Sequence, residues 1–248
     1  ESGSISEAFG VGSAANYTAS LSCTGNTQAL SGSTLTVDPA DTAITCTETN
    51  TRKFATLTLK KTWSANSKAG DTTTVTSSGF TNNASSGLST ATAAGNTTTG
   101  TSVTVYAGES GSISEAFGVG SAANYTASLS CTGNTQALSG STLTVDPADT
   151  AITCTETNTR KFATLTLKKT WAANSKAGDT TTVTSSGFTN NASSGLSTAT
   201  AAGNTTTGTS VTVYAGESGS ISEAFGVGSA ANYTASLSCT GNTQALSG

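Results

Sequence analysis

Apolar and polar residues alternate along residues 55–63, and this alternation is the clearest structural signal in the chain. A period of two places successive side chains on opposite faces of an extended strand. We therefore predict a half-buried β-strand over these residues. One face would carry Ala55, Leu57, Leu59, Lys61 and Trp63, and the other would carry Thr56, Thr58, Lys60 and Thr62.

Weaker alternation of the same kind recurs after this segment, and turn-forming residues separate the stretches. The turn signals include 68–71, 94–96, 107–108 and 132–134, which are rich in Gly, Asn and Asp. About eight short strands at this spacing, without helical periodicity, predict an all-β fold of the Ig-like β-sandwich type. Besides 55–63, the expected strands are 72–76, 88–92, 102–106, 112–117, 125–131, 141–145 and 151–158.

The whole pattern repeats every 108 residues. Residues 1–108 return as 109–216 with one difference, Ser64 against Ala172, and a third copy begins at residue 217. Solenoid repeat units run to about 20 to 50 residues, so a period of this length corresponds to a complete small domain. We expect a tandem array. Length, reach and multivalency grow with copy number, which favours a structural or display role.

Composition excludes several classes of function. The chain has no His, so Ser-His-Asp and Cys-His nucleophiles and His-containing metal sites cannot form. Its 10 basic and 14 acidic residues leave a net charge of −4, which offers no basic footprint for nucleic acid. No apolar run approaches the roughly 20 residues of a membrane-spanning helix. We expect no enzyme activity of the usual kind, no cofactor, no metal and no membrane span.

The five cysteines follow the repeat, two to each copy. The spacing predicts disulfides between Cys23 and Cys46 and between Cys131 and Cys154. Each would close about 24 residues and contribute on the order of 3 kcal/mol. Two alternatives are buried free thiols and a tetrathiolate metal site, although no CxxC pair is present. Disulfides predict an extracellular or cell-surface location.

Two segments resemble the opening and closing strands of a known module. The opening pattern is Leu57-Thr58-Leu59-Lys60-Lys61, and the closing pattern is the stretch 152–159, ITCTETNT. Both are similar to the prealbumin-like, collagen-adhesin B-type domains that occur in tandem on bacterial surface proteins. The resemblance implies a role in cell adhesion and a domain frame that differs from the start of the printed sequence.

In that frame, residues 1–53 are the C-terminal half of one module, 54–161 form a complete module, and 162–248 are the N-terminal part of a third. Closing strand passes into opening strand through Thr159-Arg160-Lys161-Phe162, without Gly or Pro. A connection this short is not a flexible Gly/Ser tether, so we expect neighbouring identical repeats to stack end to end as a rod.

The same resemblance implies a self-formed isopeptide bond between the first and last strands. The matching residues are Lys61 as the amine, Asn158 as the amide and Glu115 as the acid that promotes the reaction. Two features depart from the family pattern: Glu156 shares the face of Asn158, and the Pro and Gly that follow the Glu in the family are absent. The alternative is that Lys61 extends to solvent, with Glu115 and Asn158 as ordinary solvated residues.

Two functions of different classes follow as expectations. In the first, the repeats form the stiff stalk of a secreted bacterial surface adhesin. In the second, the repeats self-assemble, by strand donation or lateral packing, into an extracellular filament or sheath. A third class, one weak ligand site per repeat, has no motif that identifies a ligand.

Overall fold

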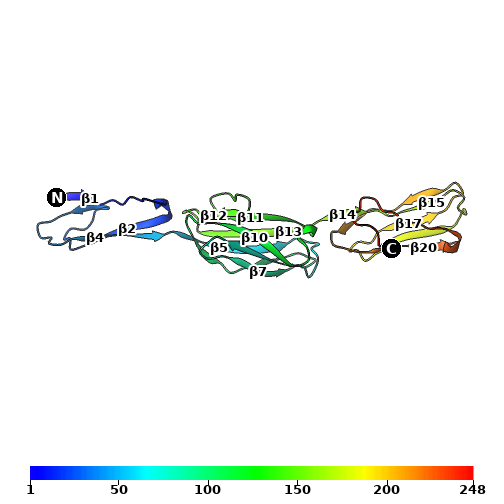
Figure 1. Ribbon diagram of the computed structural model, residues 1–248, viewed down its shortest axis with the longest axis horizontal. Helices are drawn as coiled ribbons and strands as arrows, with labels where there is room; N and C mark the ends of the chain where they lie inside the picture. The colour runs from blue at the N-terminus through cyan, green and yellow to red at the C-terminus, as the bar shows by residue number, and fades with distance from the viewer. Residues whose placement is uncertain (248) are drawn as a thin grey trace. The chain divides into compact units, whose positions relative to one another are not determined.

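A computed structural model describes residues 1–247 of the chain, which fall into two compact units. The first runs from Glu1 to Arg160, and the second begins at Lys161. Both consist of β-strands joined by turns, with three-residue 3-10 helices in addition (Figure 1). The all-β class predicted from the alternation is confirmed.

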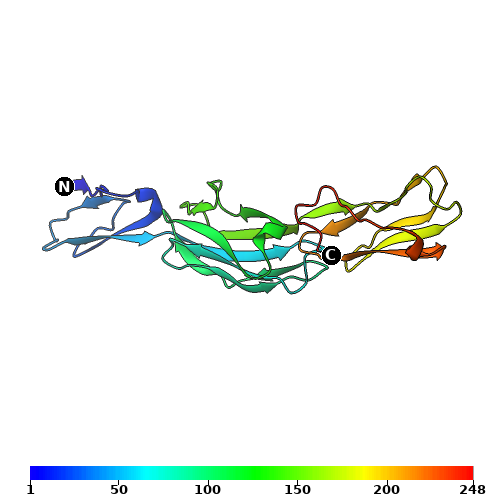
Figure 2. The same ribbon diagram turned by 45° about the vertical axis from the view of Figure 1, so that its right-hand side comes forward.

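Residues 54–161 contain nine strands and one short helix, η2, at Ala122–Asn124. Figure 2 shows its strands, coloured cyan to green, in two layers. The strands are β5 (Phe54–Trp63), β6 (Thr72–Ser78), β7 (Ser85–Thr90), β8 (Asn96–Thr99), β9 (Val103–Tyr106), β10 (Ser110–Val119), β11 (Tyr125–Thr132), β12 (Thr142–Thr144) and β13 (Ala151–Arg160).

These strands form two sheets. One has the order β12-β10-β6-β7, and the other has the order β11-β13-β5-β8 with β9 also paired to β5. The first and last strands of the segment, β5 and β13, are neighbours and run parallel from Ala151↔Thr56 to Asn158↔Trp63. The two ends of the segment are therefore joined through one strand ladder.

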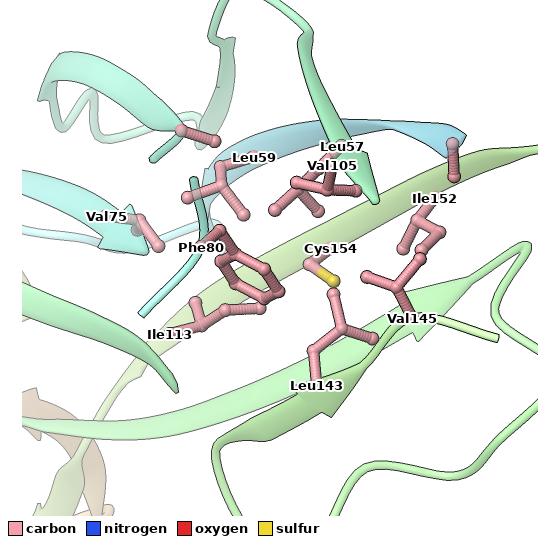
Figure 3. Close-up of a cluster of buried hydrophobic side chains, with 12 residues drawn as sticks. Leu57, Leu59, Val75, Phe80, Val105, Ile113, Leu143, Val145, Ile152 and Cys154 are labelled. Atoms are coloured by element: carbon pink, nitrogen blue, oxygen red, sulfur yellow. The ribbon is translucent and has the colours of Figure 1, made fainter. Parts of the chain in front are cut away.

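A hydrophobic core lies between the sheets. Leu57 and Leu59 of β5 point toward Ile113 and Leu143 of the facing sheet, with Phe80 between them (Figure 3). Each fully buried aliphatic side chain of this size contributes about 1.5 to 3 kcal/mol. The remaining members of the core are Ala55, Val75, Ala84, Val105, Val145, Ile152 and Cys154.

A second cluster is aromatic. Trp63 meets Phe117 and Tyr125 edge-on, with ring centroids 6.0 and 5.2 Å away. The indole is 1% exposed, and its Nε1–H donates to Ser89 Oγ at 3.0 Å. A buried Trp with a satisfied N–H is a core residue. Trp63 offers no exposed ring for carbohydrate stacking.

Residues 1–53 repeat only the last strands of this arrangement. β2 (Tyr17–Thr24) pairs with β4 (Thr45–Arg52), and β1 (Ser2–Ser4) pairs with β3 (Thr34–Thr36). The helix η1, Ala14–Asn16, precedes β2. The β2–β4 register, with Cys23 opposite Cys46, repeats that of β11 and β13.

The second unit repeats the first strands. Here the counterpart of β5 is assigned as two pieces, β14 (Phe162–Leu165) and β15 (Lys168–Trp171). Among the described residues, no parallel strand lies beside them as β13 lies beside β5. The other elements are β16 (Thr180–Ser186), β17 (Ser193–Thr198), β18 (Asn204–Thr207), β19 (Val211–Tyr214), β20 (Ser220–Val227) and η3 (Ala230–Asn232).

The sequence prediction differs from the structure mainly in strand number and bounds. The sequence predicted about eight strands per repeat, and residues 54–161 contain nine. The missed strand is β8, whose residues Asn96–Thr99 are all polar and so lack alternation. β7 begins at Ser85 and ends at Thr90, earlier than the predicted 88–92.

Candidate functional site: a buried lysine, glutamate and asparagine

The three residues matched to the isopeptide chemistry come together inside residues 54–161. Lys61 lies near the end of β5, and Asn158 lies near the end of the adjacent parallel strand β13. Glu115 reaches them from β10 in the facing sheet, where it occupies the inward phase between Ile113 and Phe117. Two sheets therefore contribute to one cluster.

A single carboxylate contacts both partners of the expected bond. Glu115 Oε1 lies 2.6 Å from Lys61 Nζ. Asn158 Nδ2 donates to Glu115 Oε1 at 2.9 Å and to Oε2 at 3.1 Å. The Lys61 amine and the Asn158 amide are thus held on the same group.

The cluster is shielded from water. Lys61 and Asn158 are 0% exposed, and the Glu115 side chain is 11% exposed. The alternative in which Lys61 extends to solvent is therefore wrong. Its inward direction follows from the phase of β5, since Lys61 continues the series Ala55, Leu57 and Leu59.

Among the described residues, Asn158 Oδ1 is a buried polar atom without a hydrogen-bond partner. The other buried polar atom of interest, Lys61 Nζ, is paired with Glu115 Oε1 at 2.6 Å. Buried polar groups are nearly always paired, and exceptions mark stored strain or reactive groups. The two atoms belong to the amine and the carbonyl that the expected reaction joins.

Burial also shifts the acid-base equilibria of the cluster. Desolvation lowers the pKa of Lys61, against the opposing effects of Glu115 and Glu156. Desolvation and then the negative charge of Glu115 raise the pKa of Glu156. A lowered pKa makes the neutral, nucleophilic amine more accessible. Lys61 Nζ also lies 4.8 Å from the centre of the Trp63 ring. This cation–π contact favours the charged form of the lysine.

Glu156 lies opposite Lys61 in the β5–β13 ladder and is 8% exposed. The sequence mapping assigned the acid to Glu115, although Glu156 shares the face of Asn158. The hydrogen bonds from Asn158 and the 2.6 Å contact with Lys61 both go to Glu115. Glu156 therefore modifies the charge of the site, whereas Glu115 contacts the groups that would react.

The incomplete copies contain parts of the same constellation. In residues 1–53, Asn50 Nδ2 donates to Glu7 Oε1 at 2.6 Å. In the second unit, Lys169 Nζ lies 2.6 Å from Glu223 Oε1. Within residues 1–247, only 54–161 bring an amine, an amide and a carboxylate together in this way.

The predicted disulfides are confirmed. Cys23 is bonded to Cys46 and Cys131 to Cys154, in both cases between strands that pair side by side. The free-thiol and metal-site alternatives for these four residues are therefore wrong. Cys239 is an exposed free cysteine. Within the described residues, no group of three or more potential ligands is placed to hold a metal ion.

None of the helices among the described residues is long and apolar enough to cross a membrane. Comparison with known proteins finds no match to any family, curated protein or solved structure. The resemblance to collagen-adhesin B-type domains therefore remains a prediction from the residues quoted above.

Proposed function

We propose that the chain is a load-bearing part of the stalk of an extracellular bacterial adhesin, built from Ig-like β-sandwich modules in tandem. We further propose that the complete module locks itself with an isopeptide bond between Lys61 and Asn158. The observation that carries this proposal is the buried Glu115 carboxylate shared by the amine and the amide. The two disulfides support the extracellular location.

The reaction requires no oxidant or cofactor. Glu115 accepts a proton from the Lys61 ammonium, and the neutral Nζ attacks Cγ of Asn158. A bond forms between Nζ and Cγ, and the bond between Cγ and Nδ2 breaks. Glu115 delivers that proton to Nδ2, which leaves as ammonia, and the carboxylate then takes up the second proton that Nζ loses as it becomes the amide nitrogen. The site shields the reacting groups from water and holds them together, which is how proximity and acid-base catalysis lower a barrier.

The position of the bond suits a mechanical role. Tension along a chain of modules enters at the start of β5 and leaves at the end of β13. Because these strands are adjacent and parallel, tension loads their hydrogen-bond ladder in shear, along its eight paired positions. A bond between Lys61 and Asn158 would carry that tension covalently, so the intervening strands would not be pulled apart.

Intact mass measurement tests the crosslink. Measured after reduction of both disulfides, the 248-residue polypeptide should weigh one ammonia less than its sequence mass, because one module has all three groups in place. Reduced Lys61→Arg should have the full mass of its own sequence. Lys169→Arg is the matched control, since Lys169 also contacts a glutamate but has no corresponding amide beside it. A parent protein of full sequence mass would overturn the crosslink proposal.

The alternative role, self-assembly into a filament or sheath, is favoured by one surface feature. Leu88 and its repeat counterpart Leu196 are each 67% exposed, on a chain with a net charge of only −4. Electron microscopy of the purified chain separates the two roles. Isolated particles at high concentration support the stalk, and ordered bundles support the filament.

A further inference from the structure

The connection between β4 and β5 joins residues 1–53, which belong to one repeat module, to the next module, residues 54–161. Side chains from both modules lie beside it. Residues 1–53 contribute Arg52, at the end of β4, and Asn16, at the end of η1. The following repeat contributes the turn between β9 and β10, residues 106–109. Both parts belong to the first compact unit.

Arg52 contacts this turn in three ways. Its Nε–H and Nη2–H both donate to the Ala107 carbonyl, at 3.1 and 2.9 Å. Its Nη1 lies 3.8 Å from Glu109 Oε1, and its guanidinium lies 5.3 Å from the centre of the Tyr106 ring. A planar guanidinium suits this combination because its donors form a rigid fork and its face stacks on aromatic rings.

Backbone contacts reinforce the side chain. Lys53 N–H donates to the Asn16 carbonyl at 2.8 Å, and Ala107 N–H donates to the Lys53 carbonyl at 3.0 Å. A Cβ at Gly108 would lie 2.5 Å from Asn16 Nδ2. The Asn16 side chain is able to move away from such a Cβ, so it is the φ of +82° at Gly108 that favours glycine in this turn.

The turn that receives Arg52 is held in place within its own repeat. Glu109 N–H donates to the Tyr106 carbonyl at 3.0 Å, and Tyr106 N–H donates to Glu109 Oε2 at 3.0 Å. Glu109 Oε1 also accepts bonds from the backbone and the hydroxyl of Thr81. These contacts are made by residues other than Arg52, so they hold the turn in position to receive it.

We propose that Arg52 and Asn16 form an interaction surface whose partner is the 106–109 turn of the following repeat, and that this contact fixes the orientation of consecutive repeats. The same residue types recur one period later as Arg160, Asn124 and residues 214–217. The inference extends the proposed structural role but does not depend on the Lys61–Asn158 bond.

Distance measurements between spin labels test the junction. Labels are introduced as noncanonical amino acids at Ser20 and Leu88, which are exposed and lie in residues 1–53 and 54–161 respectively. The cysteines then stay unchanged. We expect a narrow distance distribution in the parent and one at least twofold broader in Arg52→Ala. Arg52→Lys keeps the charge but lacks the fork, and it should also broaden the distribution.

A second label pair supplies the control. Leu88 and Ser128 both lie in residues 54–161, and their distance distribution should be equally narrow in all three proteins. Equal widths for the Ser20 and Leu88 pair in the parent and Arg52→Ala would overturn the proposal. A narrow distribution in Arg52→Lys would overturn the assignment to the guanidinium fork. The intact mass of the same samples reports on the crosslink separately, so the two proposals fail independently.

Discussion

Lys61 shows how one residue in the core phase of a strand changes what a module is able to do. A lysine among Leu57, Leu59 and Trp63 pays a desolvation cost that an aliphatic residue would avoid. Ion pairing with Glu115 offsets part of that cost. Converting Lys61 and Asn158 to a neutral amide would remove the buried ammonium altogether. Formation of the bond would therefore remove the desolvation cost of the buried ammonium and stabilise the folded module.

The two acidic residues near Lys61 should differ in their effect on this reaction. Glu115→Gln removes the group that contacts both the amine and the amide, so we expect crosslinking to slow by at least about a hundredfold, the usual contribution of acid-base catalysis. Glu156→Gln should still form the bond. Intact mass after timed incubation of each variant measures the rate. Equal rates would assign the proton transfer to neither residue.

Tyr125 provides a second residue-level prediction, at alkaline pH. Its hydroxyl donates to Asp71 Oδ2 at 2.7 Å and accepts from Lys68 N–H at 3.1 Å. Desolvation, followed by the hydrogen bond to Asp71, raises the pKa of Tyr125 to about 12. Because the folded-state pKa is the higher one, this group stabilises the fold below pH 10 and loses that contribution as the pH rises toward 12.

We therefore expect Tyr125→Phe to cost about 1 to 3 kcal/mol at neutral pH, because Asp71 remains buried without its hydroxyl partner. The difference from the parent should shrink as the pH rises from 10 to 12. Denaturant titrations at several pH values measure both effects. A pH-independent difference would contradict the role of the phenol ionisation.

At the scale of strands, the sequence predicted correctly those strands that bury one face and expose the other. Apolar alternation located β5 because one of its faces is core and the other is not. It missed β8, whose threonines and asparagine carry no burial signal. The inward phase of Lys61 and Asn158 is readable from their own strands. Their proximity to Glu115 is not, because it depends on how the two sheets face each other.

The disulfide between β11 and β13 gives a prediction at the same scale. Replacing Cys131 and Cys154 together with Ser should destabilise residues 54–161 by about 3 kcal/mol, since the closed loop is about 24 residues long. Cys23→Ser with Cys46→Ser is the matched control because that pair lies in residues 1–53. Its effect on the unfolding of 54–161 should be small. Chemical denaturation compares the two double variants.

For the molecule as a whole, the crosslink and the disulfide predict how far the chain extends under tension. With the proposed bond in place, tension on the parent should pass from Lys61 to Asn158, so the residues between them should stay folded. In Lys61→Arg, rupture of the β5–β13 ladder should release the chain between Phe54 and Arg160 except for the loop closed by the disulfide. That loop spans 23 residues. The released part is about 83 residues, or roughly 280 Å at about 3.4 Å per residue.

Single-molecule pulling between the chain termini measures these lengths. Adding a reductant to Lys61→Arg should lengthen the step by roughly 80 Å as the disulfide opens. The parent should show neither step from residues 54–161, with or without reductant, because the loop closed by Cys131 and Cys154 lies within the bypassed segment. A parent that lengthens like Lys61→Arg would mean that tension is carried by hydrogen bonds alone, and the proposed mechanical role of the Lys61–Asn158 bond would fail.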